Sequence, residues 1–331
     1  MDLTRVYDPE LLPALEVFLS QPQLNWEDLP GTRALLQEAM RQMKASFPDS
    51  PHILKEDHQV PGPEGAPAVP VRLYRPQAEP APMPGLLWIH GGGYVIGSVE
   101  QDDLLAQHLA ERVGCLVVSV DYRLAPEHPF PAAIEDCYAA LKWMASRADE
   151  LGLDRTRLAI GGASAGGGLT AALALLTRDR GEIPLIFQLL IYPMLDDRDA
   201  TRSSELFAEA PIWNREDNRR GWRAYLGEAA GGPHVSPYAA AARAQDLRGL
   251  PPAFMAVGAA EIFLDEDVDY ALRLAHAGVP VELQVYPRAY HAWDGIAPLS
   301  RLAQQLAANR DRALREALHP QSAGLPHRGA E

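Results

Sequence analysis

The sequence predicts an α/β protein with a largely parallel sheet covered by helices on both faces. The first observation is a series of short apolar runs, each too short for a buried helix, at residues 86–90, 115–120, 158–161, 185–191, 253–257 and 281–286. The second is that segments with helical spacing separate most of these runs, at 102–112, 132–146, 169–177 and 265–277. Strands that alternate with helices form crossover units, and crossover units build parallel sheets.

The regions at the two ends of the chain differ from this alternating part. Residues 1–50 place apolar side chains at helical spacing, as at Leu11, Leu15 and Phe18. Residues 49–84 are rich in proline and contain short alternating runs near Val69–Tyr74, which is typical of edge strands. The segment 299–318 has the pattern of an amphipathic closing helix. We therefore expect the main domain to span residues 51–331.

One stretch interrupts the alternation. Between Ile191 and Ala253 about 60 residues carry no strand signal, and a featureless loop of that length is uncommon in a compact domain. We interpret the stretch as an inserted helical cap at about 197–240, joined by the helices of residues 1–50.

Composition excludes several classes of protein. The formal net charge of −14 over 331 residues argues against nucleic-acid binding. The two cysteines, Cys115 and Cys137, give neither a disulfide framework nor a metal-ligand spacing, and Cys115 is expected to be buried and unreactive. The chain shows no secretion signal and no apolar segment of the roughly 20 residues that cross a bilayer. We therefore expect a cytoplasmic protein without stable membrane association.

The sharpest local pattern is G-x-S-x-G at residues 162–166, directly after the predicted strand 158–161 and before an Ala- and Leu-rich helix. This is the strand–turn–helix context of a nucleophile elbow, whose strained turn only small residues can flank. The helix N-terminus also favours developing negative charge. A plain glycine-rich turn or a phosphate loop is the alternative, but no phosphate-loop pattern accompanies the motif. The sequence predicts Ser164 as nucleophile, with Gly162 and Gly166 supporting the turn.

A second glycine-rich motif lies about 70 residues upstream, directly after the predicted strand that ends at Ile89. Glycines allow the backbone to approach a ligand closely and to turn its N–H groups inward. Acyl transfer needs such donors, because the carbonyl oxygen becomes an alkoxide in the tetrahedral intermediate. We expect three amides as oxyanion donors and two further residues as support for the loop: Gly91, Gly92 and Ala165 as donors, His90 and Gly93 as support.

A nucleophilic serine needs a base, and in elbow-containing folds the chain order is serine, acid, histidine. Four histidines follow a suitable acid. His276 lies in a helical segment, and His319 and His327 lie in the C-terminal tail. His291 follows the predicted strand 281–286 after a short loop. We expect His291 to be the base.

Two acidic residues compete for the orienting carboxylate. Glu261 falls in the turn beyond the predicted strand 253–257, whereas Asp265 falls where a helix begins and is explained as a helix N-cap. We favour Glu261 and keep Asp265 as the alternative.

These motifs resemble one known family, the hormone-sensitive-lipase-like bacterial esterases, over residues 85–294. The matching segments are 90–94 (HGGGY), 121–127 (DYRLAPE), 162–167 (GASAGG) and 290–292 (YHA). The resemblance implies an α/β-hydrolase fold with an eight-stranded sheet, a helical cap, and hydrolysis of short- to medium-chain esters. It also implies that the proline-rich loop with Ala125-Pro126 and Phe130-Pro131 packs beside the elbow, with one of these bonds cis.

The chain departs from the family pattern at two positions. Ala163 stands before the nucleophile, where the family usually has Asp, and Glu261 stands at the usual Asp acid position. Hydrolases of this fold accept either carboxylate. The resemblance therefore predicts a carboxylesterase with the triad Ser164, His291 and Glu261 and with no metal or organic cofactor.

Other readings use the same residues. An amidase, deacetylase or lactone hydrolase would employ the same triad, and a ligand receptor of this fold would be expected to lose Ser164 or His291. A membrane-surface lipase would want an apolar lid, whereas the expected cap carries many charges between Arg215 and Arg220. The expected partner is a small-molecule ester, and the last strand with its neighbouring helix offers a surface for a homodimer.

Overall fold

The computed structural model describes residues 3–47 and 49–320. Its centre is one sheet of eight strands in the order β1-β2-β4-β3-β5-β6-β7-β8. β2 runs antiparallel to both of its neighbours, and the other neighbouring pairs from β4 to β8 are parallel. The predicted α/β-hydrolase sheet is thus confirmed. The strands are β1 Ile53–Val60, β2 Val69–Pro76, β3 Met83–Ile89, β4 Leu116–Val120, β5 Leu153–Ala163, β6 Phe187–Ile191, β7 Ala253–Gly258 and β8 Val281–Tyr286.

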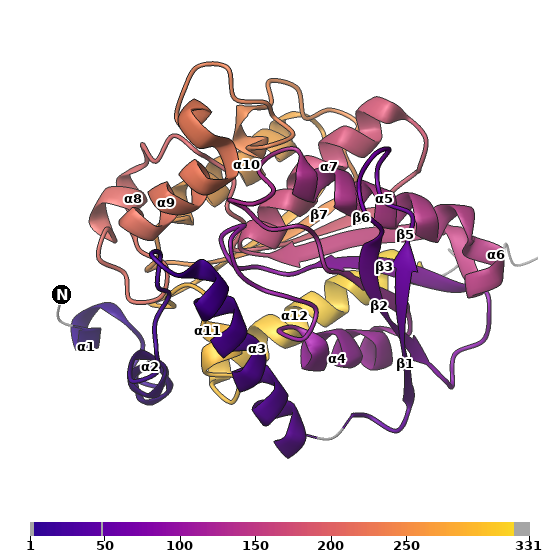
Figure 1. The fold of residues 1–331 in the computed structure, drawn as a ribbon, viewed down its shortest axis with the longest axis horizontal. Helices are drawn as coiled ribbons and strands as arrows, with labels where there is room; N and C mark the ends of the chain where they lie inside the picture. Colours follow the sequence, from indigo (N-terminus) through magenta and orange to yellow (C-terminus); the bar gives the residue numbers. More distant parts are fainter. Residues whose placement is uncertain (1–2, 48, 321–331) are drawn as a thin grey trace, which may run out of the picture.

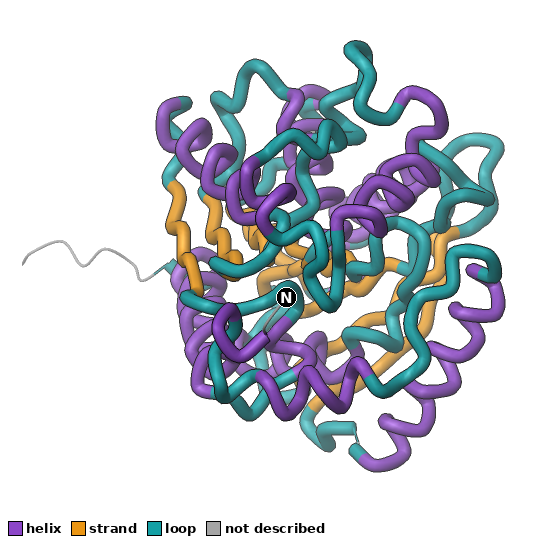
Figure 2. Tube along the Cα trace, turned by 90° about the vertical axis from the view of Figure 1, so that its left-hand side faces the viewer, coloured by secondary structure: helices purple, strands orange, loops and turns teal. Residues whose placement is uncertain are grey.

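Helices cover the two faces of the sheet in separate layers, as Figures 1 and 2 show. On one face α5 (Ala132–Ser146), α7 (Ala165–Arg180) and α10 (Leu264–His276) pack on side chains such as Leu87, Leu190 and Met255. On the other face α4 (Asp103–Val113) and α12 (Arg301–Leu318) pack on side chains such as Trp88 and Phe254. The central strands are buried on both faces, which is why they appear in the sequence as continuous apolar runs.

The remaining helices are short or lie at the edge of these layers. Figure 1 shows α3, α8 and α9 in the left half of the view, together with the N-terminal α1 and α2. They are α1 Leu3–Val6, α2 Leu12–Leu19, α3 Leu29–Ser46, α6 Ala148–Leu151, α8 Arg202–Leu206, α9 Arg215–Leu226, η1 Gly227–Ala229, η2 Ala241–Arg243 and α11 Trp293–Ile296. Of the helices in the described ranges, none is both long and apolar enough to cross a membrane.

Two strands extend beyond the apolar runs of the sequence. β1 is an edge strand whose interior residues are mostly polar and exposed, so it leaves no apolar run. The first half of β5, from Leu153 to Arg157, is likewise partly exposed. Both cysteines are buried, and burial raises the pKa of the Cys115 thiol to about 12, as expected for an unreactive residue.

Candidate active site

The nucleophile motif forms the sharp turn between β5 and α7. Ser164 has φ 56° and ψ −122°, a conformation that non-glycine residues rarely adopt. Its N–H donates to the Ile191 carbonyl at 2.9 Å, which ties the turn to the end of β6. A Cβ atom at Gly162 would lie 2.4 Å from the Gly166 oxygen, and one at Gly166 would lie 2.1 Å from the Ile89 oxygen. The turn therefore requires glycine at both flanking positions.

Three side chains from separate loops meet in one hydrogen-bonded chain. His291 Nε2 lies 2.9 Å from Ser164 Oγ, and His291 Nδ1 lies 2.5 Å from Glu261 Oε2. The second carboxylate oxygen of Glu261 accepts a hydrogen bond from the Gly258 N–H at 2.9 Å. Ser164 is 9% exposed, His291 4% and Glu261 0%. Glu261 thus has no aqueous contact, and the backbone and the imidazole fix its orientation.

Asp265, the alternative acid, is engaged elsewhere. Its carboxylate accepts the Ser203 N–H at 2.7 Å, at the first turn of α8. The Ser203 hydroxyl in turn accepts the Asp265 N–H and donates to the Ile262 carbonyl. Asp265 therefore joins α10 to α8. It does not cap its own helix, because the N-cap position of α10 is Phe263.

The three other histidines considered from the sequence lie elsewhere. His276 is the last residue of α10, and His319 lies 2.8 Å from the Val113 carbonyl through its Nε2. His327 lies outside the described residues. Among the candidate bases that the structure describes, His291 is the one that lies next to Ser164.

The glycine motif after β3 lies directly against the nucleophile. A Cβ atom at Gly91 would lie 2.9 Å from the Ala163 oxygen and 3.3 Å from Ser164 Cβ. The three expected donors are the N–H groups of Gly91, Gly92 and Ala165. None of them forms a hydrogen bond with another residue that the structure describes. Free amides beside a serine hydroxyl are what an oxyanion needs.

His90 lies beneath this loop. Its imidazole is fully buried, stacks on the Tyr122 ring with centroids 4.3 Å apart, and has Nδ1 2.8 Å from the Gly91 carbonyl. The Tyr122 hydroxyl donates to the His90 carbonyl at 3.0 Å. Burial lowers the pKa of His90, and Nδ1 donates to the Gly91 carbonyl because that oxygen can only accept. These contacts suit a support for the loop.

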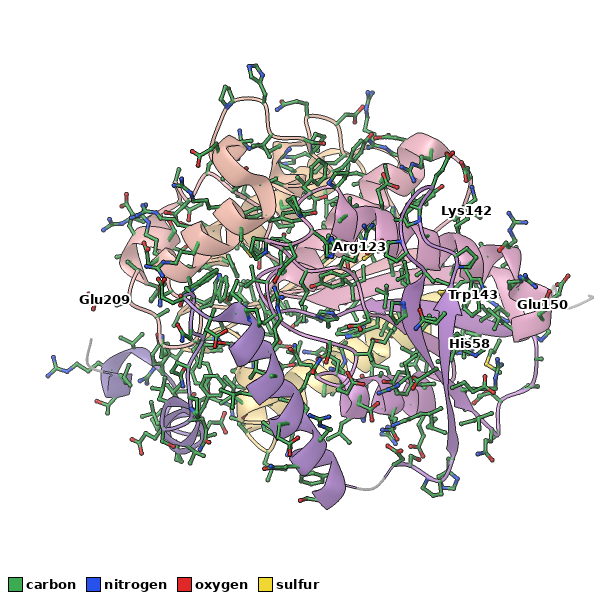
Figure 3. The ribbon with its side chains drawn as sticks, viewed as in Figure 1. His58, Arg123, Lys142, Trp143, Glu150 and Glu209 are labelled. Carbon is green, nitrogen blue, oxygen red and sulfur yellow. The ribbon has the colours of Figure 1, made fainter. Side chains whose placement is uncertain are left out.

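The loop between β4 and α5 packs beside the glycine motif. Arg123, labelled in Figure 3, donates from Nε and Nη2 to the Asp136 carboxylate at 2.8 and 2.7 Å. The Ala125 N–H donates to the Tyr94 carbonyl at 2.9 Å, which joins the two loops. Two of the three proline bonds in this loop are cis, Ala125-Pro126 and Phe130-Pro131, whereas the family resemblance suggested one.

Two aromatic residues that the sequence does not mark as site residues contact the His291 ring, Tyr192 and Phe263. The Tyr192 ring meets the His291 ring edge-on with centroids 4.8 Å apart, and its hydroxyl donates to Asp294 at 2.7 Å. Tyr192 follows β6 at φ 35°, so it shares with the other site residues a position just past a strand end. The Phe263 ring also meets the His291 ring edge-on, with centroids 5.1 Å apart.

Trp213, in the segment before α9, contacts the glycine motif. A Cβ atom at Gly93 would lie 2.1 Å from the Trp213 ring. The tryptophan therefore packs directly on the third glycine of the motif, and the absence of a side chain there makes room for it.

Comparison with known proteins places this chain in a family. Residues 86–294 match the family described as alpha/beta hydrolase fold. The chain belongs to this family, in its hormone-sensitive-lipase-like branch. It is 36% identical to carboxylesterase NlhH of Mycobacterium tuberculosis over 94% of this chain and 97% of that protein. It is 37% identical to esterase LipI of the same organism over 94% of this chain and 95% of the relative.

Two solved structures of esterases are similar to this chain over almost its whole length. A bacterial heroin esterase superposes with a TM-score of 0.90 at 40% identity, covering 95% of this chain and 98% of that one. Esterase LipW from Mycobacterium marinum superposes with a TM-score of 0.87 at 37% identity, covering 96% and 97%.

Proposed function

We propose that this chain hydrolyses short- to medium-chain carboxylic esters through an acyl-enzyme on Ser164, with His291 as general base and Glu261 as the orienting acid. That the chain is a carboxylic-ester hydrolase follows from its similarity to esterases over most of its length. One observation supports the proposed triad and acyl-enzyme mechanism. It is the continuous hydrogen-bonded chain from Ser164 Oγ through the imidazole to the buried Glu261 carboxylate.

The geometry supports a two-step acyl transfer. Glu261 accepts the proton on His291 Nδ1 as a hydrogen bond, which leaves Nε2 free to accept the Ser164 proton. The serine oxygen attacks the ester carbonyl, and the protonated imidazole then gives its proton to the leaving alkoxide. Water attacks the acyl-enzyme by the same steps and releases the acid.

The negative charge of each tetrahedral intermediate falls on the former carbonyl oxygen. The amides of Gly91, Gly92 and Ala165 are the donors we assign to it, and the loss of one such donor typically costs about 100- to 1,000-fold in rate. Ala165 is also the first residue of α7, so the helix N-terminus adds its partial positive charge.

The surroundings of the serine support the substrate class. The rings of Tyr192, Phe263 and Trp213 lie around His291 and the glycine motif. These side chains are bulky and mostly apolar, which suits small uncharged esters. The names of similar proteins also refer to esterases, among them a heroin esterase.

The direct test is turnover of 4-nitrophenyl acetate by Ser164→Ala. We expect turnover to fall by at least about 1,000-fold, because the nucleophile is lost, while the far-UV circular dichroism spectrum stays unchanged. Asp265→Asn serves as the matched acid control and should keep most activity, whereas Glu261→Gln should lose about 100-fold or more. Activity that survives Ser164→Ala, or that depends on Asp265 rather than Glu261, contradicts the proposal.

The substrate range needs a second measurement. Turnover across 4-nitrophenyl esters of increasing acyl length, beside matched anilides, should fall steeply beyond about eight carbons and should be much lower for the anilides. Equal rates with esters and anilides would point instead to an amidase.

A further inference from the structure

Arg33, on the N-terminal helix α3, contacts loops of the active site that are distant in sequence. Its Nε donates to the Val95 carbonyl at 2.7 Å, and its Nη2 donates to the Ala125 carbonyl at 2.8 Å. Nη1 and Nη2 also donate to the Glu127 carboxylate at 2.8 and 2.9 Å. One guanidinium group thus joins three segments: α3, the glycine loop and the loop between β4 and α5.

The Val95 end of this contact lies in the turn that holds the oxyanion donors. The Gly92 carbonyl accepts the N–H groups of both Val95 and Ile96, each at 3.0 Å, so the chain folds back immediately after the glycines. The backbone conformation of Gly92, at φ +118°, depends on this turn. A bond that fixes the carbonyl of Val95 fixes the exit of the turn and restricts the amides of Gly91 and Gly92.

The shape of the guanidinium group matters for this role. Its planar fork donates in several fixed directions at once, whereas an ammonium group is a point charge on a flexible stem. The Arg33 side chain is 21% exposed and Glu127 is 45% exposed. Because that ion pair is partly solvated, it contributes little free energy by itself. The bonds to the two carbonyl groups are therefore the more important part of the contact.

A second set of contacts joins the same N-terminal segment to α9 and to Trp213. Trp26 Nε1 donates to Asp217 on α9 at 2.7 Å, and the Trp26 ring lies 6.4 Å from the Trp213 ring. Trp213 packs on Gly93. The N-terminal segment therefore touches the glycine loop directly at Val95 and indirectly at Gly93.

We infer that Arg33 is a positioning residue for ester hydrolysis: by holding the Val95 and Ala125 carbonyls, it keeps the Gly91 and Gly92 amides aimed at the oxyanion. This inference rests on the proposed function. Displacement of a reacting group by about 1 Å costs on the order of 100-fold in rate. Loss of Arg33 should accordingly lower kcat by about 10- to 100-fold and change KM by less than about threefold.

The test combines kinetics with an oxyanion probe. Arg33→Ala and Arg33→Lys are compared with the wild-type chain for kcat and KM on 4-nitrophenyl acetate, and for inhibition by an aryl trifluoromethyl ketone. That ketone forms a hemiketal alkoxide on the serine, so its affinity reports the oxyanion donors. We expect the inhibition constant of Arg33→Ala to rise by the same factor by which kcat/KM falls, and we expect Arg33→Lys to recover part of both.

Two controls separate this role from general stability. Arg41→Ala removes another arginine of α3, one that pairs only with the exposed Glu38 in the described chain, and should leave kcat within about twofold. Glu127→Gln removes the charge but keeps both carbonyl bonds, and should cost less than about threefold. A loss in Glu127→Gln as large as in Arg33→Ala would overturn the inference, because the ion pair would then be the decisive contact.

The inference also fails if kcat of Arg33→Ala stays within about threefold of wild type, or if KM rises while inhibitor affinity is unchanged. Should Arg33→Ala not fold, Arg33→Lys and Arg33→Gln decide the same question, and wild-type kcat in both would overturn it. Ser164→Ala distinguishes the two proposals. If Ser164→Ala is inactive while the Arg33 variants are fully active, the inference about Arg33 is wrong and the proposed function stands.

Discussion

Two helices of the expected cap are attached to the protein in different ways: α9, from the inserted segment, and α3, from the N-terminal part. α9 buries Trp222 and Tyr225, and the Tyr225 ring stacks on Tyr94 with centroids 4.2 Å apart. Its first turn is also fixed by Asp199, whose carboxylate accepts Nε–H from both Arg215 and Arg219. α9 is therefore held by ring packing over its length and by charge at its start.

α3 has little apolar burial. Among its described side chains only Leu29 and Thr32 are buried, and Leu35 is 61% exposed. Its attachment is mainly polar, through Arg33. Substitutions in the two helices should therefore change different measured quantities. Loss of packing in α9 should lower the free energy of unfolding, whereas loss of the polar contact in α3 should lower the rate of catalysis.

The largest expected effect on stability is that of Trp222→Ala in α9. The Trp222 side chain is 1% exposed and lies 5.2 Å from the Tyr94 ring. Removing a buried tryptophan usually costs about 3–5 kcal/mol. Urea unfolding followed by circular dichroism should show this loss, and Trp222→Phe should recover part of it. A change below about 1 kcal/mol would show that ring packing does not hold α9.

A smaller, pH-dependent effect is expected at Glu266 of α10, which contacts the segment that follows β6. Glu266 is buried, and its Oε1 accepts the N–H groups of Leu195 and Asp196. Burial raises the pKa of Glu266 well above its ordinary value. The folded state therefore keeps a proton that the unfolded state loses above about pH 4.3, so this group lowers stability as pH rises from there towards its folded pKa, by at most about 1.4 kcal/mol per pH unit.

Glu266→Gln keeps the acceptor oxygen and removes the titration. The variant should be more stable than wild type at pH 8 and should gain less at pH 5, as measured by urea unfolding at both values. A gain that is equal at the two pH values would show that Glu266 does not titrate differently in the folded state.

The smallest effect is expected for Leu35→Ala in α3. Because the side chain is mostly exposed and alanine favours helix, the free energy of unfolding should change by less than about 0.5 kcal/mol. Together with Arg33→Ala, this variant tests whether apolar packing or the polar contact attaches α3. If Leu35→Ala lowers stability by more than about 1 kcal/mol, α3 is held by apolar packing after all.

Much of the geometry of the candidate site could be predicted, because its residues obey local rules. Ser164, Glu261 and His291 each follow the C-terminal end of a strand, and parallel strands bring those ends to one edge of the sheet. The choice between Glu261 and Asp265 followed from the same rule. Glu261 lies in the turn just past the strand, and Asp265 already lies in the helix that follows.

The rest could not be predicted because it depends on contacts without a local pattern. Arg33 reaches Val95 and Ala125 across 62 and 92 residues, and nothing in the sequence of α3 marks that arginine among its neighbours. β1 was harder to place than the central strands for a related reason. An edge strand with mostly polar, exposed residues gives no apolar run.

The packing of Trp213 on Gly93 couples two positions that are distant in sequence. A substitution that adds a side chain at position 93 requires a smaller residue at 213, and Trp213→Ala opens space beside the glycine loop without touching the hydrogen-bonded chain from Ser164 to Glu261. Relatives that carry a bulkier residue at one position should therefore carry a smaller one at the other. For protein engineering, a smaller residue at position 213 is necessary but not sufficient for a side chain at position 93, because the backbone there, at φ +58°, also disfavours any residue other than glycine.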